Sequence, residues 1–232
     1  MRIALILSGG TGLRMNMDIP KQYVKVNNKP VFMYAYETLA KHKDIDGIWI
    51  VADKMWRSAI DKWVKEARLF DKLRGFSNPG ANRQLSIYNG IKDISQFAAP
   101  SDVVLIHDAA RPLISEELIS SCFNSMKNCD GVIPTIAMKD TVYLSRDGKK
   151  ITSLLNREQI YAGQAPEVFI LGKYLDANIA LLPDKIYSIN GSTEPTIMAG
   201  MNINMISGDE DNFKITTQND LDRFVQIVGG RN

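Results

Sequence analysis

The chain opens on a short apolar run that breaks into glycines. Residues 2–7 read Arg-Ile-Ala-Leu-Ile-Leu, and residues 8–12 read Ser-Gly-Gly-Thr-Gly. A buried strand that ends in glycines predicts an anion-binding loop, because missing side chains let backbone N–H groups approach a phosphate closely. Arg14 and Lys21 follow within a few residues and would add fixed positive charge. The start of the chain therefore predicts a strand followed by a polyphosphate-binding loop.

Several kinds of glycine loop can be compared with this segment. A P-loop needs Gly-x-x-x-x-Gly-Lys-Ser/Thr, which is absent. A dinucleotide-binding loop fits Gly10 and Gly12, and Asp53 could bind the ribose, but Met15 replaces its third glycine. A nucleotidyltransferase loop, which wraps a nucleoside triphosphate, also uses the two cations. An NAD-type oxidoreductase, a non-catalytic nucleotide sensor and a plain glycine turn stay open as alternatives.

Composition limits the remaining possibilities. The 232 residues are 45% hydrophobic, which is enough for one sizeable core, so we expect a single domain over residues 1–232. The net charge is only +2, and the absence of a basic block argues against nucleic acid as a partner. No apolar run approaches the ~20 residues that span a bilayer. We expect no membrane association, a cytoplasmic location and two reduced cysteines.

Strand-like and helical segments alternate along the chain. Residues 47–51 and 103–106 are continuous apolar runs typical of strands covered on both faces, and residues 83–94 have helical spacing. Ser115 is placed to cap a further helix. This alternation predicts an α/β fold with a doubly wound, mostly parallel sheet of the Rossmann-like type.

Residues 138–160 interrupt the alternation. Two strand-like runs, 141–144 and 151–154, flank an Asp-Gly pair at residues 147–148, which is a strong hairpin signal. A lone hairpin is marginally stable in water, so it should pack on something. We interpret it as a protruding arm that reaches a partner subunit in a homodimer; an edge hairpin folded on its own domain is the alternative.

The strand at residues 103–106 leads directly into a second candidate site. Ligands of doubly wound folds bind beyond the carboxyl ends of strands, which is where Asp108 stands. Its carboxylate is a candidate ligand for Mg²⁺, whose remaining ligands would be phosphates and waters. The alternative is that Asp108 caps a turn and pairs with Arg111. We expect His107 to be a buried packing residue without a catalytic role.

Lys214 is a third candidate. Residues 212–217 have the apolar pattern of a final strand, and Thr217 with Asp220 resembles a capping box for the helix that follows. Lys214 would then lie in mid-strand, facing either the same phosphate site or solvent at an edge of the sheet.

Taken together, these motifs resemble those of the cytidylyltransferases that make CDP-linked polyols. That family includes the methylerythritol-phosphate enzyme of isoprenoid synthesis and the ribitol-phosphate enzyme of teichoic-acid synthesis. The resemblance extends over nearly the whole chain. Its motifs are residues 9–12 with Arg14, Pro20-Lys21-Gln22-Tyr23, Gly80-Ala81-Asn82-Arg83 with Ser86, Asp108-Ala109-Ala110-Arg111-Pro112, Lys139-Asp140-Thr141, Asn156-Arg157 and residues 212–217.

The resemblance implies a role for each motif. Arg14 and Lys21 would contact the CTP phosphates and stabilise the transition state, and Lys214 would contact the acceptor or its attacking phosphate. CTP, with Mg²⁺, would be bound by residues Leu7, Ser8, Gly9, Gly10, Thr11, Gly12, Gly80, Ala81, Arg83, Ser86 and Asp108. The acceptor would be bound by residues Ala109, Arg111, Thr141, Arg157 and Lys214. Thr141 and Arg157 would come from the arm of the partner subunit.

The chain departs from the family pattern in three places. Pro79-Gly80 replaces two glycines, Ala165-Pro166-Glu167 replaces a Thr-Pro-Gln stretch, and Ser192-Thr193-Glu194 replaces Thr-Asp-Glu or Thr-Asp-Ala. The loss of a carboxylate at position 193 bears on the acceptor pocket and leaves the CTP half intact.

These observations predict a transfer of CMP from CTP to a small polyol phosphate such as ribitol, arabinitol, mannitol or glycerol phosphate. The acceptor phosphate is largely a dianion at neutral pH, given a second pKa of about 6, so no general base is required. Catalysis would consist of alignment and neutralisation of charge. Methylerythritol phosphate is the alternative acceptor.

Overall fold

A computed structural model describes residues 1–10 and 19–230, so the predicted ligands Thr11, Gly12 and Arg14 lie outside the described residues. The described chain forms an eight-stranded sheet in which seven strands follow the order β10-β7-β11-β6-β1-β4-β5. The eighth strand, β12, also pairs with β7. The strands of this sheet are β1 (Arg2–Leu7), β4 (Gly47–Val51), β5 (Leu73–Ser77), β6 (Val103–Asp108), β7 (Gly131–Ala137), β10 (Tyr161–Gly163), β11 (Glu167–Ile170) and β12 (Ile203–Ser207).

The sheet is mostly parallel, as the alternation predicts. Strands β6, β1, β4 and β5 form parallel pairs, and β12 is parallel to β7. Strands β10 and β11 run antiparallel to β7, and β11 is also antiparallel to β6. The antiparallel direction of β10 and β11 follows from the arm, because the chain leaves the sheet at the end of β7 and re-enters it at that same end.

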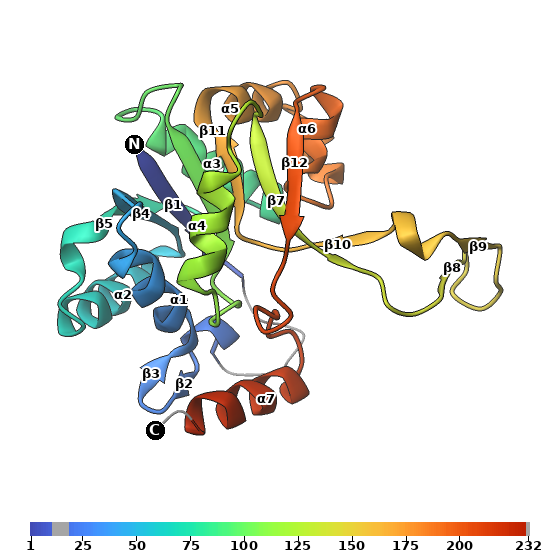
Figure 1. Ribbon diagram of the computed structural model, residues 1–232. Helices are drawn as coiled ribbons and strands as arrows, with labels where there is room; N and C mark the ends of the chain where they lie inside the picture. Colours follow the sequence, from blue (N-terminus) through green and yellow to red (C-terminus); the bar gives the residue numbers. More distant parts are fainter. Residues whose placement is uncertain (11–18, 231–232) are drawn as a thin grey trace.

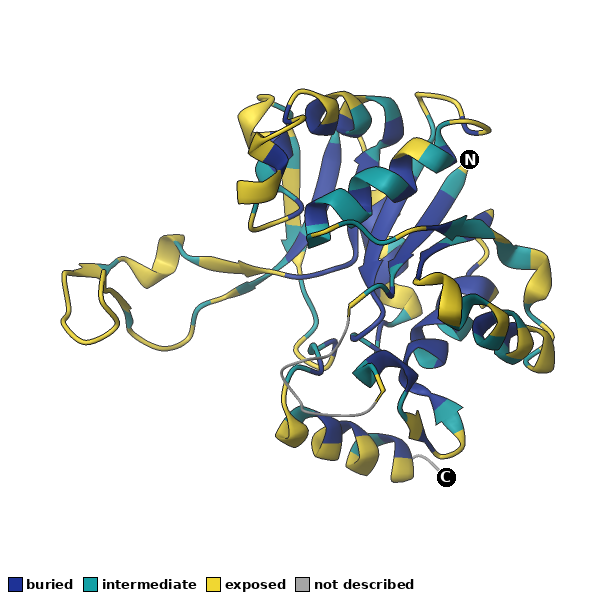
Figure 2. Cartoon of the chain, turned by 180° about the vertical axis from the view of Figure 1, so that it is seen from behind, coloured by how far each residue is buried: buried dark blue, intermediate teal, exposed yellow. Residues whose placement is uncertain are grey.

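Helices cover both faces of the sheet (Figure 1). Ala4 and Ile6 pack toward α1, α2 and α4, whereas Ile3 and Leu5 pack toward α3 and α5. Figure 2 shows the strands as the buried centre of the molecule. The helices are α1 (Val31–Lys41), α2 (Lys54–Glu66), α3 (Arg83–Ile94), α4 (Glu116–Asn124), α5 (Leu171–Ile179), α6 (Glu194–Met198) and α7 (Gln218–Gly229). The short 3-10 helices are η2 (Lys21–Tyr23), η3 (Phe70–Lys72), η4 (Arg157–Gln159) and η5 (Lys185–Ser188).

Local sequence signals account for several helix ends. Helix α3 begins and ends at the predicted residues, and the Asn82 side chain caps it by accepting from Leu85 N. Ser115 caps α4 as predicted, accepting from Leu118 N.

Across residues 1–10 and 19–230, none of these helices has the length and apolar character needed to cross a membrane.

The predicted hairpin exists and stands away from the sheet. Strands β8 (Val142–Leu144) and β9 (Ser153–Leu155) pair antiparallel with each other and form a separate two-stranded sheet. Gly148 adopts φ +69° at the turn, a conformation that glycine permits at no steric cost. The arm projects from the body and is largely exposed (Figures 1 and 2). The alternative of an edge hairpin folded on its own domain is therefore wrong.

The final strand is not where the sequence pattern places it. Residues 212–217 form no strand; they run along the end of the sheet, tied by the bond from Ile215 N to Ala110 O. The last strand is β12, which the pattern missed because only one of its edges is paired and much of it is exposed. The predicted capping box of Thr217 and Asp220 is confirmed at the start of α7. That helix packs beside the two-stranded sheet of β2 (Lys25–Val26) and β3 (Lys29–Pro30).

Candidate active site

A pocket of about 530 Å³ lies at the carboxyl ends of β1 and β6. Its wall is formed by five segments of the chain: the end of β1, η2, the start of α3, the end of β6 and the segment after β12. The described residues that line it are Leu7, Gly9, Gly10, Lys21, Gln22, Gly80, Ala81, Asn82, Arg83, Ser86, Asp108, Ala109, Ala110 and Lys214. Most of the residues predicted to bind a nucleotide are thus brought together.

Gln22 fixes the start of the glycine loop, a role that the sequence did not reveal. Its Nε2 donates to Ser8 O at 2.9 Å and to Gly10 O at 2.7 Å. Gly9 is required because a Cβ there would lie 2.5 Å from Cβ of Pro79. Ser8 is a correction: its side chain is buried and its hydroxyl donates to Tyr23 Oη, so its hydroxyl does not line the pocket.

A second loop closes the pocket at the start of α3. Gly80 N donates to Ser86 Oγ at 2.9 Å, and this hydroxyl in turn donates to Asn82 O. A Cβ at Gly80 would lie 2.3 Å from Leu85 Cβ, so a side chain at this position would clash. Ser86 therefore shapes the loop as well as lining the pocket, and the Gly80 N–H is already engaged.

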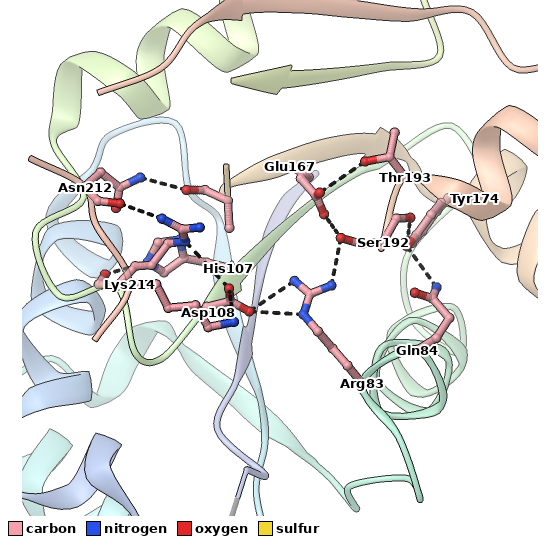
Figure 3. A network of polar contacts seen from close by, with 12 residues as sticks. Arg83, Gln84, His107, Asp108, Glu167, Tyr174, Ser192, Thr193, Asn212 and Lys214 are labelled. Carbon is pink, nitrogen blue, oxygen red and sulfur yellow. Dashed lines mark hydrogen bonds and ion pairs between the residues drawn. The ribbon is translucent and has the colours of Figure 1, made fainter. Parts of the chain in front are cut away.

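Asp108 lies among three cations (Figure 3). Arg83 Nη2 is 3.1 Å from Oδ1, Lys214 Nζ is 3.0 Å from Oδ2, and Arg111 Nε is 3.6 Å from Oδ2. Burial alone would raise the pKa of Asp108, but the charges of the three cations hold that pKa well below its usual range. The carboxylate is therefore ionised at any physiological pH.

The same contacts bear on Asp108 as a magnesium ligand. Both of its oxygens face cations: Arg83 contacts Oδ1, whereas Lys214 and Arg111 face Oδ2. A divalent ion at this carboxylate would be repelled by three positive neighbours. These residues do not fit Asp108 as the principal Mg²⁺ ligand.

Lys214 and Arg111 flank the carboxylate in different ways. Lys214 lines the pocket, as the phosphate-facing interpretation predicts, although it does not stand in a strand. Arg111 is nearly buried behind the wall, where its Nη1 donates to Asn212 O at 2.7 Å. His107 is fully buried beside it, bonded to Arg111 O, and burial lowers its pKa to about 4.

A buried acidic residue behind Arg83 was not among the predicted site residues. Glu167 accepts hydrogen bonds from the hydroxyls of Ser192 and Thr193, and Ser192 Oγ also accepts from Arg83 Nη1 at 2.8 Å (Figure 3). Two of the three departures from the family pattern therefore meet here. The family pattern has a carboxylate at position 193. Here that position is Thr193, and its hydroxyl contacts a carboxylate at position 167 instead.

The predicted acceptor ligands of the arm lie outside the pocket of their own chain. Thr141 is exposed, and the Arg157 guanidinium donates to Lys139 O within the arm. Neither residue lines the pocket. This is the arrangement expected if they act in a partner subunit.

Comparisons with known proteins agree with the geometry. A family model described as IspD, 2-C-methyl-D-erythritol 4-phosphate cytidylyltransferase, matches residues 2–229. A ribitol-5-phosphate cytidylyltransferase of Streptococcus agalactiae serotype III is 30% identical, over 100% of this chain and 97% of that protein. A 2-C-methyl-D-erythritol 4-phosphate cytidylyltransferase of Syntrophotalea carbinolica is 32% identical, over 94% and 91%. The crystal structure of 4-diphosphocytidyl-2C-methyl-D-erythritol synthase from Anaerococcus prevotii has a TM-score of 0.83 at 25% identity, covering 99% and 96% of the chains.

Proposed function

The chain belongs to the 2-C-methyl-D-erythritol 4-phosphate cytidylyltransferase family, and from this membership we propose that it transfers CMP from CTP to a small polyol phosphate, giving a CDP-polyol and pyrophosphate. The observation that carries the proposal is the meeting of Lys21, Arg83 and Lys214 around one pocket at the strand ends. The oxidoreductase alternative is not retained, because the cytidylyltransferase family model matches residues 2–229.

The pocket supports a direct displacement at the α-phosphorus of CTP. A dianionic acceptor phosphate can attack without a general base, and the reaction then needs alignment and charge neutralisation. Lys21 and Lys214 would neutralise charge on the phosphates, and Arg14 is proposed to do the same from its motif. Mg²⁺ bound mainly to triphosphate oxygens would supply further neutralisation, since phosphates and waters commonly complete its shell.

The nucleotide assignment is testable by pyrophosphate release. We expect CTP to be preferred over ATP, GTP and UTP, because a pocket that satisfies the polar edge of one base rejects other bases strongly. We also expect EDTA to abolish turnover and added Mg²⁺ to restore it. Equal use of ATP, or full activity in EDTA, would contradict the proposal.

For the acceptor we propose ribitol, arabinitol, mannitol or glycerol phosphate, destined for a wall or capsule polymer. Relatives of the ribitol-5-phosphate type that align with the whole chain support this choice. Methylerythritol phosphate is the second candidate, supported by the family description and by relatives of similar identity. The test is kcat/KM for each acceptor with CTP. A preference for methylerythritol phosphate of about tenfold or more, the effect of roughly one lost hydrogen bond, would establish the second candidate.

We further propose that two copies of the chain share their active sites through residues 138–160. Apolar side chains on and beside the arm are exposed, among them Tyr143, Ile151 and Leu154. An isolated hairpin with such side chains gains stability by packing on another surface. In a two-fold dimer the exchange would be reciprocal, so each arm would bring Thr141 and Arg157 to the other pocket.

A further inference from the structure

Glu167 is a buried acidic group to which the proposed reaction gives no role. It starts β11, and its side chain is buried behind the wall of the pocket, outside the lining residues. Both of its carboxylate oxygens accept hydroxyl hydrogens, one from Ser192 and the other from Thr193 at 3.2 Å. Burial raises the pKa of Glu167, and the charge of Arg83 opposes that rise.

The contacts continue from Glu167 to the pocket. Because the Ser192 hydroxyl donates its hydrogen to Glu167, its lone pairs face Arg83, and Nη1 of Arg83 donates to them at 2.8 Å. The backbone of Ser192 is held as well, since Tyr174 Oη donates to its carbonyl at 2.7 Å. On the other side, Nε and Nη2 of Arg83 both donate to Asp108 Oδ1. The guanidinium is thus fixed between two carboxylates, one in direct contact and one through a hydroxyl.

We infer that Glu167 is a positioning residue: acting through Ser192, its carboxylate holds Arg83 in the orientation that it presents to the pocket, and its charge requires a hydroxyl rather than a second carboxylate at position 193. A guanidinium has more N–H donors than these contacts use, so Arg83 can keep them and still bind a ligand. The inference rests on the proposed function, in which Arg83 contacts the nucleotide.

Steady-state kinetics with CTP test the positioning, at a temperature where circular dichroism shows every variant folded. We expect Glu167→Gln to raise the KM for CTP by about tenfold, the scale of one lost hydrogen bond to a charged group, with little change in kcat. Ser192→Ala should act in the same way. Glu66→Gln, on the exposed end of α2, is the matched control and should resemble wild type.

A double-mutant cycle separates positioning from a merely structural role. If Glu167 acts through Arg83, adding Glu167→Gln to Arg83→Lys should raise KM no further. If the two substitutions instead raise the KM for CTP independently, so that their fold-changes multiply in the double variant, the inference is overturned. An unchanged KM in Glu167→Gln would overturn it as well.

The dependence between positions 167 and 193 has its own test. Thr193→Asp alone would place two carboxylates in contact and should lower kcat/KM by tenfold or more. The double variant Glu167→Gln/Thr193→Asp moves the single carboxylate from position 167 to position 193 and should recover most of that loss. A fully tolerated Thr193→Asp, or no recovery in the double variant, would contradict the inference.

A third readout needs no turnover, so failure of the proposed function remains distinguishable. The Nη1 hydrogens of Arg83, which donate to Ser192, should exchange with water faster in Glu167→Gln and in Ser192→Ala than in wild type, as measured in a ¹H–¹⁵N spectrum. An unchanged exchange rate would overturn the positioning role. Absence of CTP-dependent pyrophosphate release in wild type would instead count against the proposed function alone.

Discussion

At the scale of single residues, charge balance decides what the pocket can bind. The carboxylates of Asp108 and Glu167 lie within or directly behind its wall. The described cations in the same place are Lys21, Arg83, Arg111 and Lys214. Positive charge is in excess even with both carboxylates ionised, so a polyphosphate is attracted and a bare divalent cation is repelled. In the proposed function, Asp108 would orient these cations for a phosphate ligand.

Lys21 offers a direct test at this scale. We expect Lys21→Ala to lower kcat by roughly 10²–10³, the scale for loss of one preorganised charge donor. The thermal unfolding midpoint should change little, because the side chain is half-buried at a pocket wall and adds little to the core.

The control for Lys21 is Lys62→Ala, which removes an exposed lysine from the surface of α2. It should leave both kcat and the unfolding midpoint at wild-type values. A Lys21→Ala enzyme within about tenfold of wild type, far short of the expected scale, would contradict the proposed role.

At the scale of elements, α7 stabilises the segment that carries Lys214. The Asp220 carboxylate accepts from Thr216 N at 2.9 Å and from Thr217 N at 2.8 Å, so it joins the helix start to the residues just after Lys214. Leu221 and Phe224 anchor the helix in a satellite core with Val26. Loss of this cap would loosen one wall of the pocket as well as the helix.

Asp220 also predicts a pH dependence. Partial burial alone would raise its pKa, but the bonds from the backbone and hydroxyls of Thr216 and Thr217 outweigh it and lower the pKa to about 2. A lowered carboxyl pKa means that the stabilisation is complete above the unfolded value near 4 and is lost as pH falls toward 2. We expect Asp220→Asn to lower the free energy of unfolding by about 1 kcal/mol at pH 7, after allowance for solvent screening.

Urea denaturation from pH 7 down to pH 3 measures this difference. The gap between wild type and Asp220→Asn should narrow below pH 4, whereas Asp222→Asn, in the same helix but outside the cap, should cost much less at every pH. A gap that stays constant or widens on acidification would show that the Asp220 charge does not stabilise the helix start.

At the scale of the whole molecule, the arm separates residues that the reaction would need together. Lys21 and Lys214 line the pocket, whereas Arg157 lies in the projecting arm (Figure 1). If the dimer exchanges arms, each active site combines groups from both chains. A chain with an altered pocket and a chain with an altered arm would then complement each other.

Mixing two inactive variants tests this arrangement. Lys21→Ala combined with Arg157→Ala should recover part of the wild-type activity after subunit exchange, because some mixed dimers carry one intact site. Lys21→Ala combined with Lys214→Ala is the control and should recover none, since both residues line the pocket of their own chain. A monomer in sedimentation analysis, or no recovery after confirmed exchange, would contradict the shared site.

The sequence by itself determined the features that depend on neighbouring residues. Helix α3, the Ser115 cap, the Thr217–Asp220 capping box and the arm hairpin all follow from local periodicity, side-chain caps and turn residues. The glycine loop after β1 was recognisable for the same reason, because a close backbone approach needs glycine wherever it occurs.

Only the tertiary structure decided how distant segments meet. Periodicity cannot distinguish an edge strand from an extended segment, so it predicts a strand at residues 212–217, whereas the last strand of the structure is β12. Nor can it show that Asp108 faces three cations, or that Glu167 reaches Arg83 through Ser192. The chemical type of a side chain limits which bonds it can make. Packing between elements sets its burial and its partners, and so determines which of those bonds form.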